Sequence, residues 1–212
     1  MAAEDPALLA LIHAIAAGDT LAARDLLASS PRLATLQMRV GATRQSPVPY
    51  FFQAIQHYAY AGDTPLHIGA AAYHVAIVSE LIKLGADVRA RNRRGAEPLH
   101  YAVDGIPGSS TWNPAAQAAT VTYLITAGAD PNAVDKSGVT PLHRAVRTRC
   151  AAAVNALLVG GADVHRRNAS GTLPMQLATQ TTGRGGSGSP AARAEQAEIV
   201  RLLQQAENGQ RG

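Results

Sequence analysis

The chain has 212 residues, of which 47% are hydrophobic and 4% aromatic, and its formal net charge is +4 at pH 7. This length suits one domain or one array of repeats. No apolar run reaches the roughly 18 residues of a membrane span. A lone cysteine excludes an internal disulfide and fits a reducing compartment. The composition therefore predicts a cytoplasmic protein. The preference for arginine over lysine and the many alanines are typical of a bacterial, GC-rich genome.

The first predicted element is a helix pair within residues 1–35. An apolar stretch, Ala7 to Ala17, ends at Gly18-Asp19, and Leu26-Leu27 supplies the apolar positions of a second helix. The stretch is interrupted by His13 and has no basic segment before it, which argues against a signal peptide. We therefore interpret residues 1–35 as a capping helix pair.

Residues 36–61 form an aromatic-rich insertion after this pair. Five of the nine aromatic residues fall between positions 50 and 60. Phe51, Ile55 and Tyr58 are spaced as on one face of a helix, so the pattern predicts a short extra helix. Two interpretations remain open. The rings form a small satellite core under a long loop, or they form the wall of a binding groove.

A regular pattern begins at Gly62. Thr64 stands where a helix N-cap is expected, and Pro65 stands at the first helical position. An apolar stripe, Ile77-Val78 and Leu81-Ile82, predicts a second helix that ends before Gly85, a residue suited to the left-handed conformation after a helix.

The same pattern recurs along the chain. Thr64-Pro65-Leu66-His67 is followed by equivalents that begin at Glu97, Thr140 and Leu173, so the four prolines are 33, 43 and 33 residues apart. A period of about 33 residues that carries Thr-Pro-Leu-His is the signature of the ankyrin repeat. The chain therefore resembles a bacterial-type ankyrin-repeat protein with about five repeats, atypical caps and insertions. The match is specific from Gly62 to Gln176.

This resemblance implies an all-α fold: a solenoid of stacked helix-turn-helix units with β-hairpin or turn fingers. We expect a single ankyrin-repeat domain over 1–212. Its central repeats are 62–94, 95–137 and 138–170, and its C-terminal cap is 171–212, with a flexible loop at 181–190 that has a Gly- and Ser-rich linker composition.

A second insertion, residues 106–115, separates the two helices of the second central repeat. Asn113 is positioned to cap a helix that begins at Pro114. The chain's only tryptophan, Trp112, lies in this loop. Either the loop is functional, as loops with large rings and tight turns often are, or Trp112 folds back onto an alanine-rich helix.

The histidines do not predict a metal site. His67, His100 and His143 occur once per repeat, which places them roughly 10 Å apart, too far to share an ion. The resemblance implies that these rings bond to backbone groups in neighbouring turns. His57 has no partner at ligand spacing, and Cys150 is interpreted as a small buried hydrophobic residue. The sequence thus predicts no metal and no cofactor.

The resemblance places partner recognition on the concave face and on the finger tips. Arginine and large aromatic rings dominate binding hot spots. The candidate groove residues are Tyr73, Tyr101, Asp104, Trp112, Arg144, Arg147 and Arg149. The candidate finger-tip residues are Arg91, Arg93, Arg94, Lys136 and Arg167. The alternative for Asp104 is a structural ion pair with Arg144 or Arg147.

We expect a monomeric protein-protein interaction module whose partner is an unidentified protein with an acidic surface. Acidic residues interrupt the basic finger positions, which argues against nucleic acid. The alternative is a small-molecule-binding or hydrolytic enzyme with a pocket between the aromatic insertion, the Trp112 loop and the second and third central repeats. Only in that case would Asp63 or Asp104 act as acid or base. A third possibility is a structural spacer.

Overall fold

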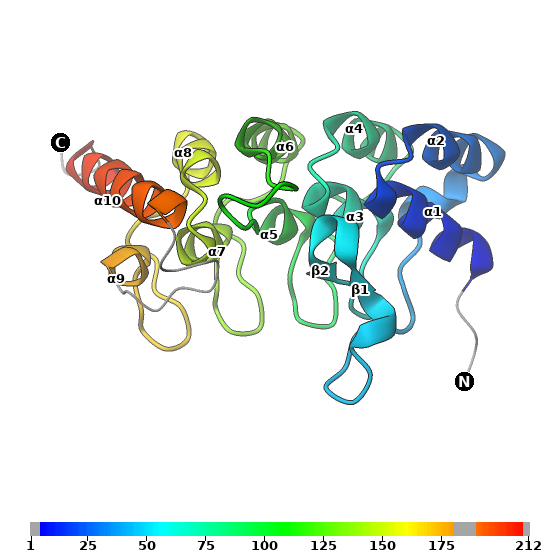
Figure 1. Ribbon diagram of the computed structural model, residues 1–212, viewed down its shortest axis with the longest axis horizontal. Helices are drawn as coiled ribbons and strands as arrows, with labels where there is room; N and C mark the ends of the chain where they lie inside the picture. Colours follow the sequence, from blue (N-terminus) through cyan, green and yellow to red (C-terminus); the bar gives the residue numbers. More distant parts are fainter. Residues whose placement is uncertain (1–4, 180–189, 210–212) are drawn as a thin grey trace.

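The computed structural model describes residues 5–179 and 190–209, and it shows an elongated stack of helices in two rows (Figure 1). One row contains α2 (Thr20–Ser29), α4 (Val75–Lys83), α6 (Pro114–Thr126) and α8 (Ala151–Val159). The other contains α1 (Pro6–Ala17), α3 (Pro65–Ala71), α5 (Pro98–Ala102), α7 (Pro141–Thr148) and α9 (Pro174–Thr179). The last helix, α10 (Pro190–Gly209), packs against α8 and α9. The predicted all-α repeat solenoid is confirmed.

Pro65 and Pro141 begin equivalent helices because the threonine before each of them caps the helix. Thr64 Oγ1 accepts a hydrogen bond from the backbone N–H of His67 at 3.4 Å, and Thr140 does the same for His143 at 3.3 Å. In return, the imidazole Nδ1 of His67 accepts from the Thr64 N–H. The cap thus satisfies N–H groups that have no partner inside the helix.

The three tetrapeptide histidines also connect each repeat to the next one. Nε2 of His67 donates to the carbonyl oxygen of Ala96 at 3.1 Å. The equivalent distances are 3.0 Å from His100 to Val139 and 3.0 Å from His143 to Thr172. Burial lowers the pKa of all three rings, and that of His100 falls to about 4. The predicted structural role of these histidines is confirmed.

One continuous hydrophobic core runs along the stack, from Leu8 in α1 to Leu203 in α10. Leu66, Leu99 and Leu142, which follow the prolines, are each at most 1% exposed. Each repeat therefore buries its apolar stripe against its neighbours, as expected for a solenoid.

The segment between the first helix pair and α3 differs from the prediction. It contains the 3₁₀ helices η1 (Pro31–Thr35), η2 (Val48–Tyr50) and η3 (Gln53–Ile55), and the strands β1 (Phe51–Phe52) and β2 (His57–Tyr58). The strands are antiparallel, with Phe51 opposite Tyr58 and Phe52 opposite His57. The predicted α-helix is therefore wrong. We call residues 50–60 the aromatic hairpin.

The aromatic hairpin packs against α1, and backbone hydrogen bonds pair the chain segments that flank it. Phe52 is 9% exposed, and its ring centroid lies 5.1 Å from that of His13 in α1. Backbone hydrogen bonds pair Met38 with Gly62 and Asp63 at 2.7 Å each. A side chain on Gly41 would collide with the backbone of Tyr60, so the chain has glycine at this close approach.

The second insertion extends from the end of α5 to the start of α6, and we call residues 103–113 the Trp112 loop. The predicted cap is confirmed, since Asn113 Oδ1 accepts from the Ala116 N–H at 3.0 Å. Of the predicted flexible loop, only Pro190 belongs to the described residues, and it begins α10. Among the helices that the structure describes, we find none with the length and apolar character of a membrane span.

Candidate functional site

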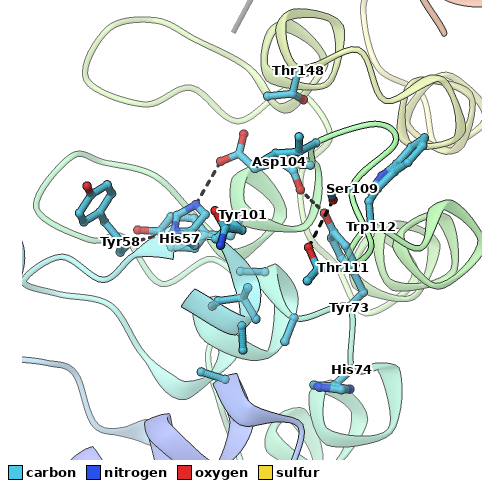
Figure 2. Close-up of a pocket in the computed structure, with 18 of the residues that line it drawn as sticks. His57, Tyr58, Tyr73, His74, Tyr101, Asp104, Ser109, Thr111, Trp112 and Thr148 are labelled. Carbon is cyan, nitrogen blue, oxygen red and sulfur yellow. Dashed lines mark hydrogen bonds and ion pairs between the residues drawn. The ribbon is translucent and has the colours of Figure 1, made fainter. Parts of the chain in front are cut away.

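A cavity of about 590 Å³, which we call the groove cavity, lies between the aromatic hairpin, the Trp112 loop and the C-terminal ends of α1, α3, α5 and α7 (Figure 2). Aromatic and polar side chains dominate its lining. They include His57, Tyr58, Tyr60, Tyr73, Arg94, Tyr101, Asp104, Ser109, Thr111, Trp112, Arg144, Arg147 and Thr148.

Rings of the aromatic hairpin, which forms one wall of this cavity, make tilted contacts with each other and with Tyr101 of α5. The ring centroids of His57 and Tyr101 are 4.3 Å apart, and those of Phe51 and Tyr58 are 4.7 Å apart. Phe52 belongs to the continuous core and not to a separate satellite core, whereas Tyr58 and Tyr60 line the cavity.

A buried carboxylate connects the hairpin to the repeats beneath the cavity. Asp63 is 0% exposed, and its Oδ2 accepts from the Tyr60 N–H at 2.6 Å and from the Tyr101 hydroxyl at 2.9 Å. Asn92 Nδ2 donates to the other carboxylate oxygen at 2.8 Å. Asp63 is not part of the cavity lining, and three internal donors engage its carboxylate, so it links the hairpin to the first two central repeats.

Asp104 is the acidic centre of the cavity lining. Its Oδ2 lies 3.2 Å from His57 Nε2 and 3.1 Å from Arg144 Nη1. Burial alone would raise the pKa of Asp104, but the Arg144 charge and the hydrogen bond from His57 outweigh it and lower the pKa to about 2. Asp104 is therefore a stable carboxylate at neutral pH.

Arg144 is buried beside this carboxylate, with its side chain 7% exposed. Its Nη2 lies 3.5 Å from Asp135 Oδ2, and its Nη1 also donates to the carbonyl oxygen of His100 at 3.3 Å. The alternative of an Asp104–Arg144 ion pair is thus correct. The expected position on the concave face implied an exposed pair, whereas both side chains are largely buried.

A second set of hydrogen bonds holds the Trp112 loop in place. The Tyr73 hydroxyl donates to the backbone carbonyl of Asp104 (Figure 2), and Gln117 Nε2 donates to the same oxygen at 3.2 Å. Trp112 Nε1 donates to Gln117 Oε1 at 3.0 Å. Trp112 therefore folds back onto α6, as one of the two interpretations of the loop expects, and it also lines the cavity.

Most of the predicted groove residues come together at this cavity. Six of them line it: Tyr73, Tyr101, Asp104, Trp112, Arg144 and Arg147. Arg149 lies outside the lining, which corrects its placement. Helix α7 ends at Thr148, and Arg149 adopts a left-handed conformation with φ of 60° and is 3% exposed.

The predicted finger-tip cations do not form one uniform surface patch. Arg91 donates to the carbonyl of Val134 and lies 3.4 Å from Glu97 Oε1. Arg167 Nη1 donates to the carbonyl of Gly171 in its own turn at 2.6 Å. The backbone of Lys136 is tied to the neighbouring finger by a hydrogen bond to the Arg94 carbonyl.

Arg93 and Arg94 instead belong to a second cavity of about 350 Å³ beside the aromatic hairpin, which we call the arginine cleft. Their guanidinium carbons lie 5.9 Å and 5.0 Å from the centre of the Tyr60 ring. The complete lining is Ala42, Thr43, Arg44, Pro47, Tyr58, Tyr60, Arg93 and Arg94. The cleft shares Tyr58, Tyr60 and Arg94 with the groove cavity.

The sequence predicted no site role for His57, and it pointed to Tyr58 and Tyr60 only as rings of the aromatic-rich insertion. His57 meets its partner Asp104 across 47 positions of sequence, a separation that no local pattern reveals. The clustering of aromatic residues after two prolines was the available signal for Tyr58 and Tyr60.

The side chains of His57 and Asp104 are both engaged by other protein groups. Nδ1 of His57 lies 2.8 Å from the carbonyl oxygen of Tyr58 and Nε2 faces Asp104, so neither nitrogen is directed at a substrate. A carboxylate with a pKa of about 2, as in Asp104, is a weak general base at neutral pH. Within the described residues, no group of three or more His, Cys, Asp or Glu side chains is arranged to hold a metal ion.

Comparisons with known proteins agree with the repeat architecture. The ankyrin repeat model matches residues 61–93 and 94–136, and a model for ankyrin repeats in many copies matches residues 124–178. A search of curated proteins found no match. The two models together cover more than half of the chain and coincide with the stacked helix pairs. The chain therefore belongs to the ankyrin-repeat family.

Proposed function

We propose that this protein is a binding module that receives a segment of a partner protein in the groove cavity. Ankyrin repeats are generally protein-protein interaction modules. The observation that carries the proposal is the groove cavity itself, because two segments that depart from the repeat pattern, the aromatic hairpin and the Trp112 loop, form its walls.

The composition of these walls supports recognition of a protein. Binding energy in interfaces concentrates in tyrosine, tryptophan and arginine side chains that fill or line pockets. Tyr58, at 38% exposure, and the exposed Arg147 are accessible at the rim, whereas Tyr101 and Arg144 are held rigidly below them. Such a preformed site loses little conformational entropy when a partner binds.

The test compares two alanine-to-tryptophan variants. Ala72 lines the groove cavity, whereas Ala119 is exposed on α6 and lines neither cavity. Ala72→Trp fills the cavity and should abolish quantitative capture of the partner proteins that the wild-type chain retains from its own cell extract. Ala119→Trp should leave capture unchanged. Equal capture by Ala72→Trp and wild type would place the interface elsewhere.

A small-molecule ligand is the second candidate, and the cavity size favours it. Ligand sites usually measure about 300–1,000 Å³, and the groove cavity falls in this range. A metabolite screen by thermal shift separates the two candidates. A compound that raises Tm of the wild type but not of Ala72→Trp would support a small-molecule site.

The proposed setting is the cytoplasm, and the proposed state is a monomer. The single cysteine, Cys150, is 0% exposed and unpaired, as is common for proteins of reducing compartments. Sedimentation equilibrium of the purified chain would test the monomeric state.

A further inference from the structure

We propose that the partner segment is acidic and that its carboxylates bind in the arginine cleft, next to the groove cavity. This inference rests on the proposed function and names the chemistry of the partner. The two cavities share Tyr58, Tyr60 and Arg94, so a chain that occupies the groove cavity needs only to cross this shared wall to reach the cleft.

The first argument is the charge of the cleft. Arg44, Arg93 and Arg94 line it, and no carboxylate is present among its described lining residues. In the groove cavity, by contrast, Arg144 is already neutralised by Asp104 and Asp135. The cleft is therefore the more strongly cationic of the two hollows, and the complementary ligand is an anion.

The second argument is how the arginines are held. Arg93 Nη2 donates to the carbonyl oxygen of Ala42 at 2.7 Å, and Arg94 Nη1 donates to the Tyr60 hydroxyl at 3.0 Å. Both acceptors are uncharged, so these hydrogen bonds orient the guanidinium groups without cancelling their charge. Each group keeps further N–H donors in the geometry that pairs with a carboxylate.

The third argument is the distribution of helix ends. The C-terminal ends of α3, α5 and α7 meet at the groove cavity, and helix C-termini carry partial negative charge that disfavours anions. The lining of the arginine cleft contains no residue of an α-helix. The acidic side chains of a partner segment therefore fit the cleft, and its uncharged or aromatic side chains fit the groove cavity.

A protein segment fits this surface better than a nucleic acid does. Nucleic acids require cations spread along an extended surface that follows the phosphate backbone. Here the neighbouring positions carry Asp87, Glu97 and Asp130, which interrupt the basic residues of the fingers. The basic residues therefore form no continuous track along the fingers.

The experiment measures binding of a fluorescein-labelled deca-glutamate peptide to the full chain by fluorescence anisotropy. Deca-glutamine tests whether charge is needed, and a single-stranded thymidine decamer tests for nucleic acid. Deca-glutamate should bind at low salt, weaken as ionic strength rises, and bind at least about tenfold more tightly than either of the other probes.

The variants test whether the cleft is the site. Arg44→Glu reverses one exposed charge of the cleft and should weaken deca-glutamate binding by about tenfold. Arg193→Glu makes the same change at an exposed position of α10, outside the lining of both cavities, and should leave binding unchanged. Arg44→Gln, which only removes the charge, should fall between Arg44→Glu and the wild type.

Three results would overturn the proposal: no binding of deca-glutamate, equal weakening by Arg44→Glu and Arg193→Glu, or binding of the thymidine decamer as tight as that of deca-glutamate. The capture test with Ala72→Trp is independent of these measurements. Loss of capture by Ala72→Trp without binding of deca-glutamate would leave the module proposal standing and remove the acidic partner.

Discussion

Arg144 Nη1 lies 3.1 Å from Asp104 Oδ2, and this contact joins the third central repeat to the loop that follows α5 in the second. His57 of the aromatic hairpin approaches the same carboxylate oxygen. A single atom of Asp104 therefore connects two repeats and the hairpin. We expect the energetic coupling among these three side chains to be measurable.

Asp104→Asn should destabilise the fold by about 3 kcal/mol, because it leaves the buried Arg144 cation with Asp135 as its remaining carboxylate partner. Chemical denaturation of Asp104→Asn, Arg144→Leu and the double variant would give the coupling energy. The double variant should be less destabilised than the sum of the single variants predicts. Strict additivity would show that the two side chains do not interact.

Stability should fall as the pH is lowered from 6.5 towards 4. The pKa of folded His100 is about 4, mainly because of burial and then because of the Arg144 charge, so only the unfolded chain binds a proton there in this interval. The contribution of neutral His100 to the free energy of unfolding is fully present above pH 6.5. About 3 kcal/mol of this contribution is lost once the pH reaches 4. Urea denaturation across this range measures the slope.

The matched variant for this slope is His100→Gln. Gln176, in the first turn of α9, occupies the position in the fourth tetrapeptide that His100 occupies in the second. Its Oε1 accepts a hydrogen bond from the Leu173 N–H at 2.8 Å. His100→Gln should show a shallower pH dependence, with the remaining slope due to His67 and His143, whose pKa values are also lowered by burial. An unchanged slope would exclude His100 as the titrating group.

Leu142→Ala should destabilise the protein by about 2–5 kcal/mol, since Leu142 is 1% exposed in the stacked core and its truncation leaves a cavity. Leu21→Ala, at a position that is 76% exposed, is the control and should change the free energy of unfolding by less than about 0.5 kcal/mol. Similar effects for both variants would contradict the assignment of Leu142 to the core.

Gly41→Ala should displace the aromatic hairpin, because the added methyl group meets the backbone of Tyr60. We expect a loss of about 1–3 kcal/mol and weaker partner capture, with the helical circular dichroism signal preserved. The control is Gly209→Ala in α10, where a methyl group meets nothing within 4 Å. Full capture by Gly41→Ala would show that the hairpin position does not matter for binding.

The periodic part of the fold was predictable because its signals are local. A cap residue, a proline and a stripe of apolar residues fix where α3, α5 and α7 begin, and each signal acts within a few positions. The cap at Asn113 was found in the same way. Six groove residues were found because they follow the tetrapeptides or lie in an insertion that breaks the period.

The hairpin was predicted incorrectly because two signals competed. Phe51, Ile55 and Tyr58 have helical spacing, but a Tyr-Phe-Phe run also has high strand propensity. Gln56 takes a positive φ of 50°, which ends the 3₁₀ turn and directs the chain into β2. His57 and the burial of Arg144 were missed because both depend on contacts between segments that are far apart in sequence.

The hairpin wall has strands of two residues each, too short to be stable in water without the contacts it makes with the stack. Its amide hydrogens should therefore exchange with solvent much faster than those of α3 or α7. This wall can open locally while every repeat keeps its neighbours, so its opening should cost less free energy than unfolding of the stack.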